Sequence, residues 1–244
     1  MTLRLGIFSK ALYPLTVLLA AGQLLAASVS GRVLLVNSHD LHGKRTKDFA
    51  GVVVWLNPLE ASLAPVPKRH VEMVQKDKKF SPHILVIGTG TTVDFPNADP
   101  IFHNAFSNFE GQIFDIGLYP PGSSQSIRFD RPGIVRVFCN IHPSMSAIIV
   151  VVDSPYFTTT DEDGNYSFLN VLPGAYIVHF FHERATPETL DALVHRITVG
   201  SAPIEMSSVT ISEAGYLPVA HKNKYGRDYP PNADQQQTYT HPPQ

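Results

Sequence analysis

Residues 138–145 read FCNIHPSM, and this stretch decides how the rest of the sequence is interpreted. Cys139 is the only cysteine in the 244 residues, so no disulfide can form within the chain. His142 and Met145 follow it at intervals of three residues. A thiolate, an imidazole and a thioether are soft donors that together favour copper over zinc or magnesium, particularly when a second histidine joins them. The spacing therefore predicts a copper site.

Short apolar runs surround this stretch and alternate with Gly, Pro, Asn and Asp, a pattern typical of packed β-sheets. The sequence therefore predicts an all-β fold. The predicted strands cover residues 30–36, 51–56, 71–75, 83–87, 91–95, 126–129, 134–138, 147–152, 166–169, 176–181, 196–199 and 207–211.

One short helix is expected after Thr186, which can cap it. Pro187 fits its first turn, and Leu190, Leu193 and Val194 fall on one helical face. An ordered loop is the alternative.

The first 27 residues resemble a signal peptide. Arg4 and Lys10 supply the positive charge, residues 11–21 the apolar centre, and residues 24–28 a small-residue cleavage zone. A periplasmic or secreted protein is therefore expected, without stable membrane insertion after cleavage. A retained anchor is the alternative, although the apolar run is shorter than the roughly 20 residues of a spanning helix.

Charge excludes one class of partner. The chain has 19 basic and 21 acidic residues, a net charge of −2. Cleavage of the leader removes two basic residues and leaves 17 against 21, or −4. This mild acidity gives no footprint for nucleic acid, which requires clustered Lys and Arg.

Residues 215–244 lack apolar periodicity and are rich in Pro, Gln, Asn, Lys and His. Such a composition buries too little apolar surface to offset the entropy of ordering. We therefore predict a flexible C-terminal tail, with His221 and His241 solvated.

Upstream of Cys139, residues 102–107 read FHNAFS and follow the strand pattern and PNAD turn of residues 91–99. Together with the spacing C-x2-H-x2-M, these motifs resemble the cupredoxins, which include plastocyanin and amicyanin, over residues 68–153. The amicyanin ligand loop has the same spacing. The resemblance implies a Greek-key β-sandwich that holds one type 1 (blue) copper ion.

The resemblance also implies the roles of individual residues. His103, Cys139, His142 and Met145 correspond to the four copper ligands. Asn104 corresponds to a residue outside the ligand set that ties the two ligand loops together and supplies a backbone amide to the cysteine sulfur.

The function implied is that of an exported carrier of single electrons, not an enzyme. In cupredoxins the second histidine reaches the surface through an apolar patch, which Ile141, Pro143, Pro100 and Phe102 could supply around His142. Its partner would be another redox protein, such as a cytochrome or a dehydrogenase, while the oligomeric state is not readable.

Other functions stay open. The site could serve periplasmic copper binding or delivery without electron transfer, or the loop could be incidental in a structural or adhesive module. A catalytic thiol with His142 as its base is not favoured, because Met145 and the His103-Asn104 step would be unexplained. A second metal site at residues 179–183 is not expected, because residues three apart on a strand face opposite sides.

A second resemblance lies outside the copper segment. VSGRV at 29–33 and AGVVVWL at 50–56 resemble the start of a carboxypeptidase regulatory-like (transthyretin-like) sandwich, and TTTDEDGNY at 158–166 and VLPGAY at 171–176 resemble its continuation. The combination resembles plastocyanin-like proteins of the methylamine-utilisation type.

We therefore predict one discontinuous Ig/transthyretin-like sandwich, residues 28–60 and 154–214, with the cupredoxin domain, residues 68–153, inserted in it. Two consecutive domains, with the early strands extending the cupredoxin, are the alternative.

Overall fold

A computed structural model describes residues 26–38, 48–60, 65–66, 69–108, 111–215 and 221–235. The predicted leader up to residue 25, and His241, lie outside the described residues. Nearly every element is a β-strand, as the sequence predicts. Among the described residues, no helix has the length and apolar character needed to cross a membrane.

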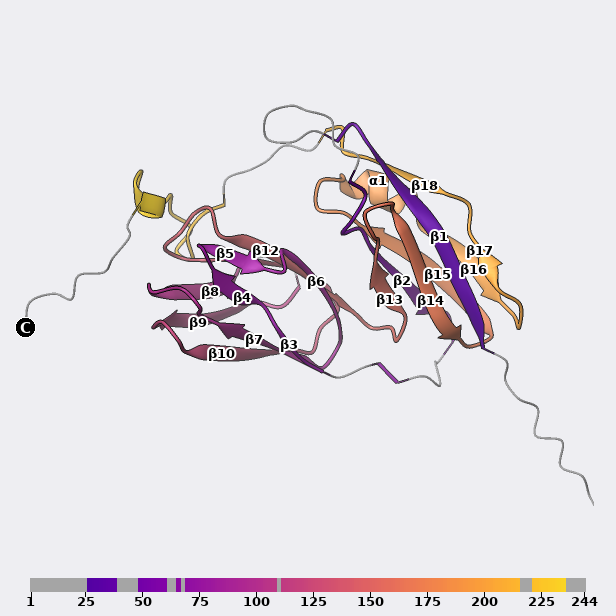
Figure 1. Cartoon of the computed structure of the whole chain (residues 1–244), viewed down its shortest axis with the longest axis horizontal. Helices are drawn as coiled ribbons and strands as arrows, with labels where there is room; N and C mark the ends of the chain where they lie inside the picture. Colours follow the sequence, from indigo (N-terminus) through magenta and orange to yellow (C-terminus); the bar gives the residue numbers. More distant parts are fainter. Residues whose placement is uncertain are drawn as a thin grey trace, which may run out of the picture.

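The first sandwich consists of the strands between residues 70 and 152 (Figure 1). A five-stranded sheet has the order β6-β12-β11-β8-β9, a three-stranded sheet has the order β10-β7-β3, and β4 and β5 form a hairpin. The strands are β3 (His70–Glu72), β4 (Val74–Lys76), β5 (Lys79–Ser81), β6 (Ile84–Gly88), β7 (Thr91–Pro96), β8 (His103–Ser107), β9 (Phe114–Tyr119), β10 (Ser124–Phe129), β11 (Gly133–Phe138) and β12 (Ser146–Val152).

Along β7, buried and partly exposed side chains alternate, and the buried ones contribute to the core of this sandwich. Thr91, Val93 and Phe95 point inward and are buried, while the residues between them are partly exposed. Val93 and Phe95 share a core cluster with Phe129 of the adjacent strand β10 and Ile149 of β12 in the other sheet. The period of two in the sequence thus produces one apolar face for each sheet.

The second sandwich combines strands from both ends of the described chain. Its sheets have the orders β14-β1-β17, with β18 also paired to β1, and β13-β2-β15-β16. Its elements are β1 (Ala27–Val36), β2 (Val53–Pro58), β13 (Phe157–Thr159), β14 (Asn165–Val171), β15 (Gly174–Phe181), α1 (Pro187–Asp191), β16 (His195–Val199), β17 (Ile204–Glu205) and β18 (Val209–Ser212).

Early and late strands alternate within these sheets. β1 pairs with β14, and β2 pairs with β15 from Tyr176 opposite Pro58 to Phe181 opposite Val53. The strands between residues 70 and 152 belong to other sheets. The chain therefore leaves this sandwich after β2, forms the first sandwich, and returns at β13.

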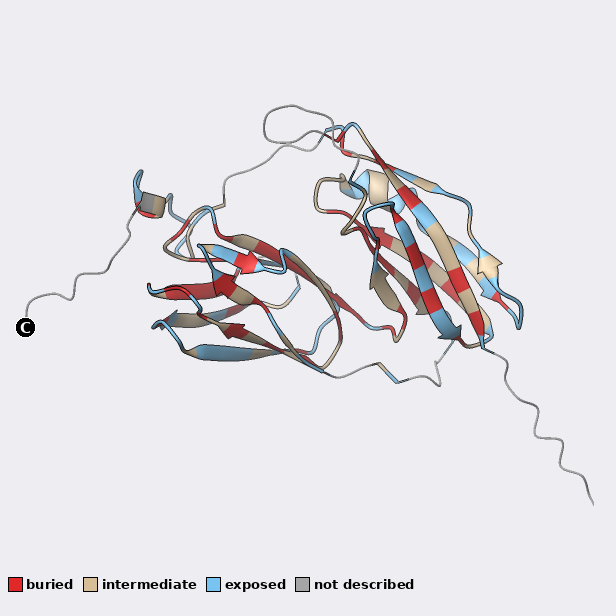
Figure 2. Ribbon diagram, viewed as in Figure 1, coloured by how far each residue is buried: buried red, intermediate tan, exposed pale blue. Residues whose placement is uncertain are grey.

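The two sandwiches are in contact along β12. One set of its side chains lies in the first core, and the other set, Ile148, Val150 and Val152, packs against Val53 and Phe181. Burial on both faces explains the uninterrupted apolar run AIIVVV, in which all six residues are buried (Figure 2, buried residues in red).

The predicted helix cap is confirmed, and several strands were missed. The Thr186 side chain accepts a hydrogen bond from the Thr189 amide, but α1 ends at Asp191, before two of the residues expected on its apolar face. β5, β8, β9, β13 and β17 are absent from the strands predicted from apolar runs. β8 is buried at all five residues although it reads HNAFS, so its polar residues hide it from a search for apolar periodicity.

Candidate metal centre

Three predicted ligands meet at one end of the five-stranded sheet. His103 is the first residue of β8, Cys139 directly follows β11, and His142 lies in the short loop before β12. β11 lies between β8 and β12 and pairs with both, so the sheet itself brings the two segments together.

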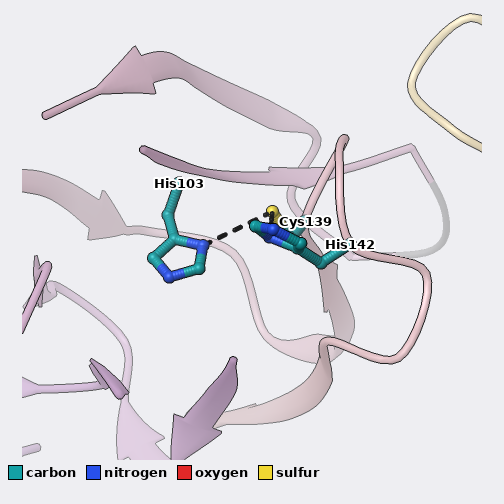
Figure 3. A group of neighbouring side chains, drawn as sticks. All are labelled: His103, Cys139 and His142. Atoms are coloured by element: carbon teal, nitrogen blue, oxygen red, sulfur yellow. Dashed lines mark hydrogen bonds between the residues drawn. The ribbon is translucent and has the colours of Figure 1, made fainter. Parts of the chain in front are cut away.

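The potential donor atoms of these residues all lie within 4.8 Å of one another. The Cys139 Sγ is 3.6 Å from the His142 Nδ1 and 4.0 Å from the His103 Nδ1. The two rings are 4.9 Å apart at 66°, and Figure 3 shows both turned toward the sulfur. All three side chains are buried, with His142 only 1% exposed.

The loop that carries two of these residues is closed on itself. The Cys139 amide donates to the Met145 carbonyl at 3.2 Å, and the Met145 amide donates to the His142 carbonyl at 3.1 Å. The Met145 side chain is fully buried in the same core cluster as Cys139. Met145 is therefore buried at the end of the loop that carries Cys139 and His142.

Asp99 fixes the ring of His103. The Nε2 atom of His103 lies 2.7 Å from the Asp99 carboxylate, which also accepts from the amides of Asp77 at 2.7 Å and Lys78 at 2.9 Å. Burial acts to raise the pKa of Asp99, but the hydrogen bonds from Lys78, His103 and Asp77 hold it below its ordinary value. The ionised carboxylate keeps the proton on Nε2, which leaves the Nδ1 lone pair facing the sulfur.

Burial also sets the protonation of the three donors. It lowers the pKa of His103 against the opposing effect of Asp99, and it lowers the pKa of His142 to about 4, helped by neighbouring His103. It raises the pKa of the Cys139 thiol, although the backbone amides of Ile141, Asn104 and His142 oppose this. At neutral pH both imidazoles are free to ligate, and a metal ion has only the thiol proton to displace.

Asn104 connects the two ligand segments. Its Oδ1 accepts from the Asn140 amide at 3.2 Å, and its Nδ2 donates to the Asp115 carboxylate and the Gly117 carbonyl, each at 2.8 Å. The residue after His103 is thus bonded to the residue after Cys139, which is the tie expected from the resemblance.

Three predictions about the surroundings of the site are wrong. His142 does not reach the surface but is buried. His221 is not solvated: its ring stacks on Phe138 at 4.1 Å, and its Nε2 lies 2.8 Å from the Pro143 carbonyl. Residues 221–235, expected in a flexible tail, instead lie against the ligand loop. No apolar pattern marks these residues in the sequence, because their contacts with the loop are mainly hydrogen bonds.

The other histidines noted in the sequence have separate partners. His179 stacks on Trp55 at 4.9 Å, and His182 pairs with Glu213 at 2.8 Å. Glu183 pairs with His83 at 2.6 Å. Within the part of the chain that the structure describes, His103, Cys139 and His142 form the only group of His, Cys and acidic residues arranged to hold a metal ion.

Sequence reasoning missed Asp99, Tyr229 and Asp234 as neighbours of the site. Asp99 had a usable signal, since a carboxylate four residues before a ligand histidine can orient its ring. Tyr229 and Asp234 had none, because each contacts a residue of the ligand loop 90 positions earlier in the sequence.

Neither a family model nor a curated protein sequence matches the chain. Among solved structures, a purple cupredoxin from Nitrosopumilus maritimus matches 34% of this chain and 99% of its own at 23% identity, with a TM-score of 0.31. A copper-containing nitrite reductase from Thermus scotoductus matches 49% of this chain and 28% of its own at 25% identity, with a TM-score of 0.33. A reduced amicyanin variant matches 34% and 81% at 20% identity, with a TM-score of 0.32. With TM-scores this low, assignment of the site depends on its own geometry.

Proposed function

We propose that this protein binds one type 1 copper ion and carries single electrons between redox partners. The observation that supports this most is the convergence of two Nδ1 atoms and one sulfur, all on buried side chains. Met145 would be the fourth, weak donor. Two imidazoles, a thiolate and a thioether form a set that both oxidation states of copper accept.

The surroundings of the ligands suit electron transfer. Copper, when bound, supplies the one-electron chemistry, and the chain supplies a site that moves little. Asp99 fixes the ring of His103, and Asn104 fixes the ligand loop. Because these bonds use atoms other than the Nδ1 and sulfur donors, they would hold the ligands in place in both oxidation states, and little reorganisation is expected.

A copper-delivery protein is the second candidate, and the geometry favours it less. Delivery requires ready exchange of the metal with a partner. Here all three donor side chains are buried, and residues 221–235 cover the loop that carries two of them. This arrangement favours a retained ion.

The remaining features of the proposal come from the sequence. Residues 1–27 would direct export to the periplasm or the cell exterior, and the electron donor and acceptor would be proteins, such as a cytochrome or a dehydrogenase. The second sandwich would be of the carboxypeptidase regulatory-like type, interrupted by the copper sandwich.

Spectroscopy of the purified mature chain tests the proposal. Addition of Cu(II) should produce an intense blue absorption band and a type 1 paramagnetic resonance spectrum. Cys139→Ser and His103→Ala should abolish the band, Met145→Leu should shift it, and the distant control His179→Ala should leave it unchanged. Binding of copper without this band, or persistence of the band in Cys139→Ser, would reject electron transfer through a type 1 site.

A further inference from the structure

The ligand loop is covered by a segment from the far end of the described chain, residues 221–235, which we call the C-terminal strap. Figure 1 shows this segment, drawn in yellow with the short helix η1 (Ala233–Gln235), at the end of the first sandwich that faces away from the second. His142, the ligand expected at the surface, is buried at this end.

Polar contacts join the strap to four residues of the ligand loop. The Tyr229 hydroxyl donates to the Cys139 carbonyl at 2.7 Å, and the Lys224 amide donates to the Asn140 side chain at 3.0 Å. The amide and hydroxyl of Ser144 donate to the Asp234 carboxylate at 3.3 and 2.9 Å. With the contact of His221 to the Pro143 carbonyl, the strap follows the loop along its length.

The strap is also fixed on either side of the loop. The Lys224 ammonium pairs with Asp115 of β9 at 2.7 Å, and the Lys78 ammonium donates to the Asp234 carbonyl at 2.5 Å. Asp115 is also the residue that holds Asn104. The strap thus bridges the β4–β5 hairpin, the ligand loop and β9.

Few apolar contacts hold the strap in place, apart from the His221 ring that stacks on Phe138. Ala233 is its one buried hydrophobic residue, and Tyr225 is 71% exposed. Each hydrogen bond contributes a small net amount, and a segment with little buried apolar surface opens more easily than the sheets beneath it. We therefore expect the strap to open while the sandwich stays folded.

We propose that the C-terminal strap is a closing device that controls access to the metal centre. Closed, it separates Cys139 and His142 from reagents, from competing ligands and from protein partners. Open, it exposes the ligand loop. The strap would also limit electron exchange with a docked partner, and this part of the proposal rests on the proposed function. Its role as a cover over Cys139 does not depend on that function.

The test uses the metal-free full-length chain and measures the rate at which a dithionitrobenzoate reagent modifies Cys139. Tyr229→Phe removes one hydrogen bond to the loop, and Asp234→Ala removes two. Each lost hydrogen bond should raise the rate about fivefold, so we expect about fivefold for Tyr229→Phe and about 25-fold for Asp234→Ala, and about 125-fold in the double variant if the strap opens as one unit. The matched controls lie on the same strap away from the loop: Tyr225→Phe, and Asp228→Ala, which breaks only an exposed pair with Lys222.

Rates within twofold of the original chain in the double variant, or equal increases in the controls, would overturn the proposal. Hydrogen exchange on the original chain provides a second test that needs no variant. The amides of Lys224 and Ser144 should share one protection factor, below that of β12, and exchange of the Lys224 amide at the rate of an unfolded peptide would overturn the proposal.

A third measurement distinguishes a failure of the strap proposal from a failure of the proposed electron-transfer function. Copper-loaded variants should keep the blue band while their electron self-exchange becomes faster. If the original chain shows no blue band with copper, the copper proposal is rejected. The rates of Cys139 modification would still decide whether the strap covers this residue.

Discussion

Replacement of Asp99 by asparagine should weaken metal binding while it leaves the shape and the packing of the site nearly unchanged. The carboxylate is 8% exposed and accepts three hydrogen bonds, from the His103 ring and from the amides of Asp77 and Lys78. Asparagine has nearly the same shape but only one accepting oxygen. Its NH2 group must therefore face at least one of these donors.

The expected magnitude follows from that mismatch. A buried donor left without a partner costs about 1–3 kcal/mol, so Asp99→Asn should destabilise the folded chain by about 2 kcal/mol. The His103 ring would also lose the charge that keeps its proton on Nε2. Loss of such an orienting partner weakens metal binding by roughly 10–100-fold, or about 1.4–2.8 kcal/mol.

Two assays check this result. Competition with a coloured Cu(I) chelator gives the affinity, and nitrogen NMR of the metal-free chain gives the tautomer of His103, which should change from pure Nε2–H to a mixture in Asp99→Asn. Asp130→Asn is the matched control, since Asp130 is exposed and pairs only with Arg128 among charged groups. An affinity within twofold of the original chain, with an unchanged tautomer, would refute the positioning role of Asp99.

Two further predictions concern stability. Gly164 has φ +83°, and an added Cβ would collide with the Val33 carbonyl, whereas Gly51, at φ +80°, has nothing within 4 Å. Gly164→Ala should cost about 2–4 kcal/mol and Gly51→Ala about 1 kcal/mol in chemical denaturation, and equal losses would contradict the steric explanation. The hydrogen bond from His83 to Glu183 raises the pKa of His83 above 6.5 and lowers that of Glu183 below 4.5. The pair therefore stabilises the fold fully between those unfolded-state values, less as pH rises through the folded pKa of His83, and less as pH falls through that of Glu183. Because the pair is partly exposed, Glu183→Gln should lower the melting temperature by only about 1–2 °C near pH 5.5 and by less above the raised pKa, and a difference independent of pH would contradict this.

Much of the fold was readable from the sequence because it depends on short-range patterns. The period of two in TTVDF and the continuous apolar run AIIVVV each report which faces of a strand are buried. The spacing of Cys139, His142 and Met145 fits one tight loop, so these side chains share one end of the sheet. Thr186 and Pro187 likewise predicted where α1 begins, because a helix cap is a local interaction.

Tertiary structure alone decided the surroundings of the site. β8 reads as polar because the residues that serve the site, His103 and Asn104, are buried through partners rather than through apolar character. The contacts of Tyr229 and Asp234 with the ligand loop join segments 90 residues apart by hydrogen bonds. A single hydrogen bond leaves no periodic trace in a sequence, whereas the burial of an apolar face does. The donor atoms could therefore be predicted from the sequence, but their enclosure could not.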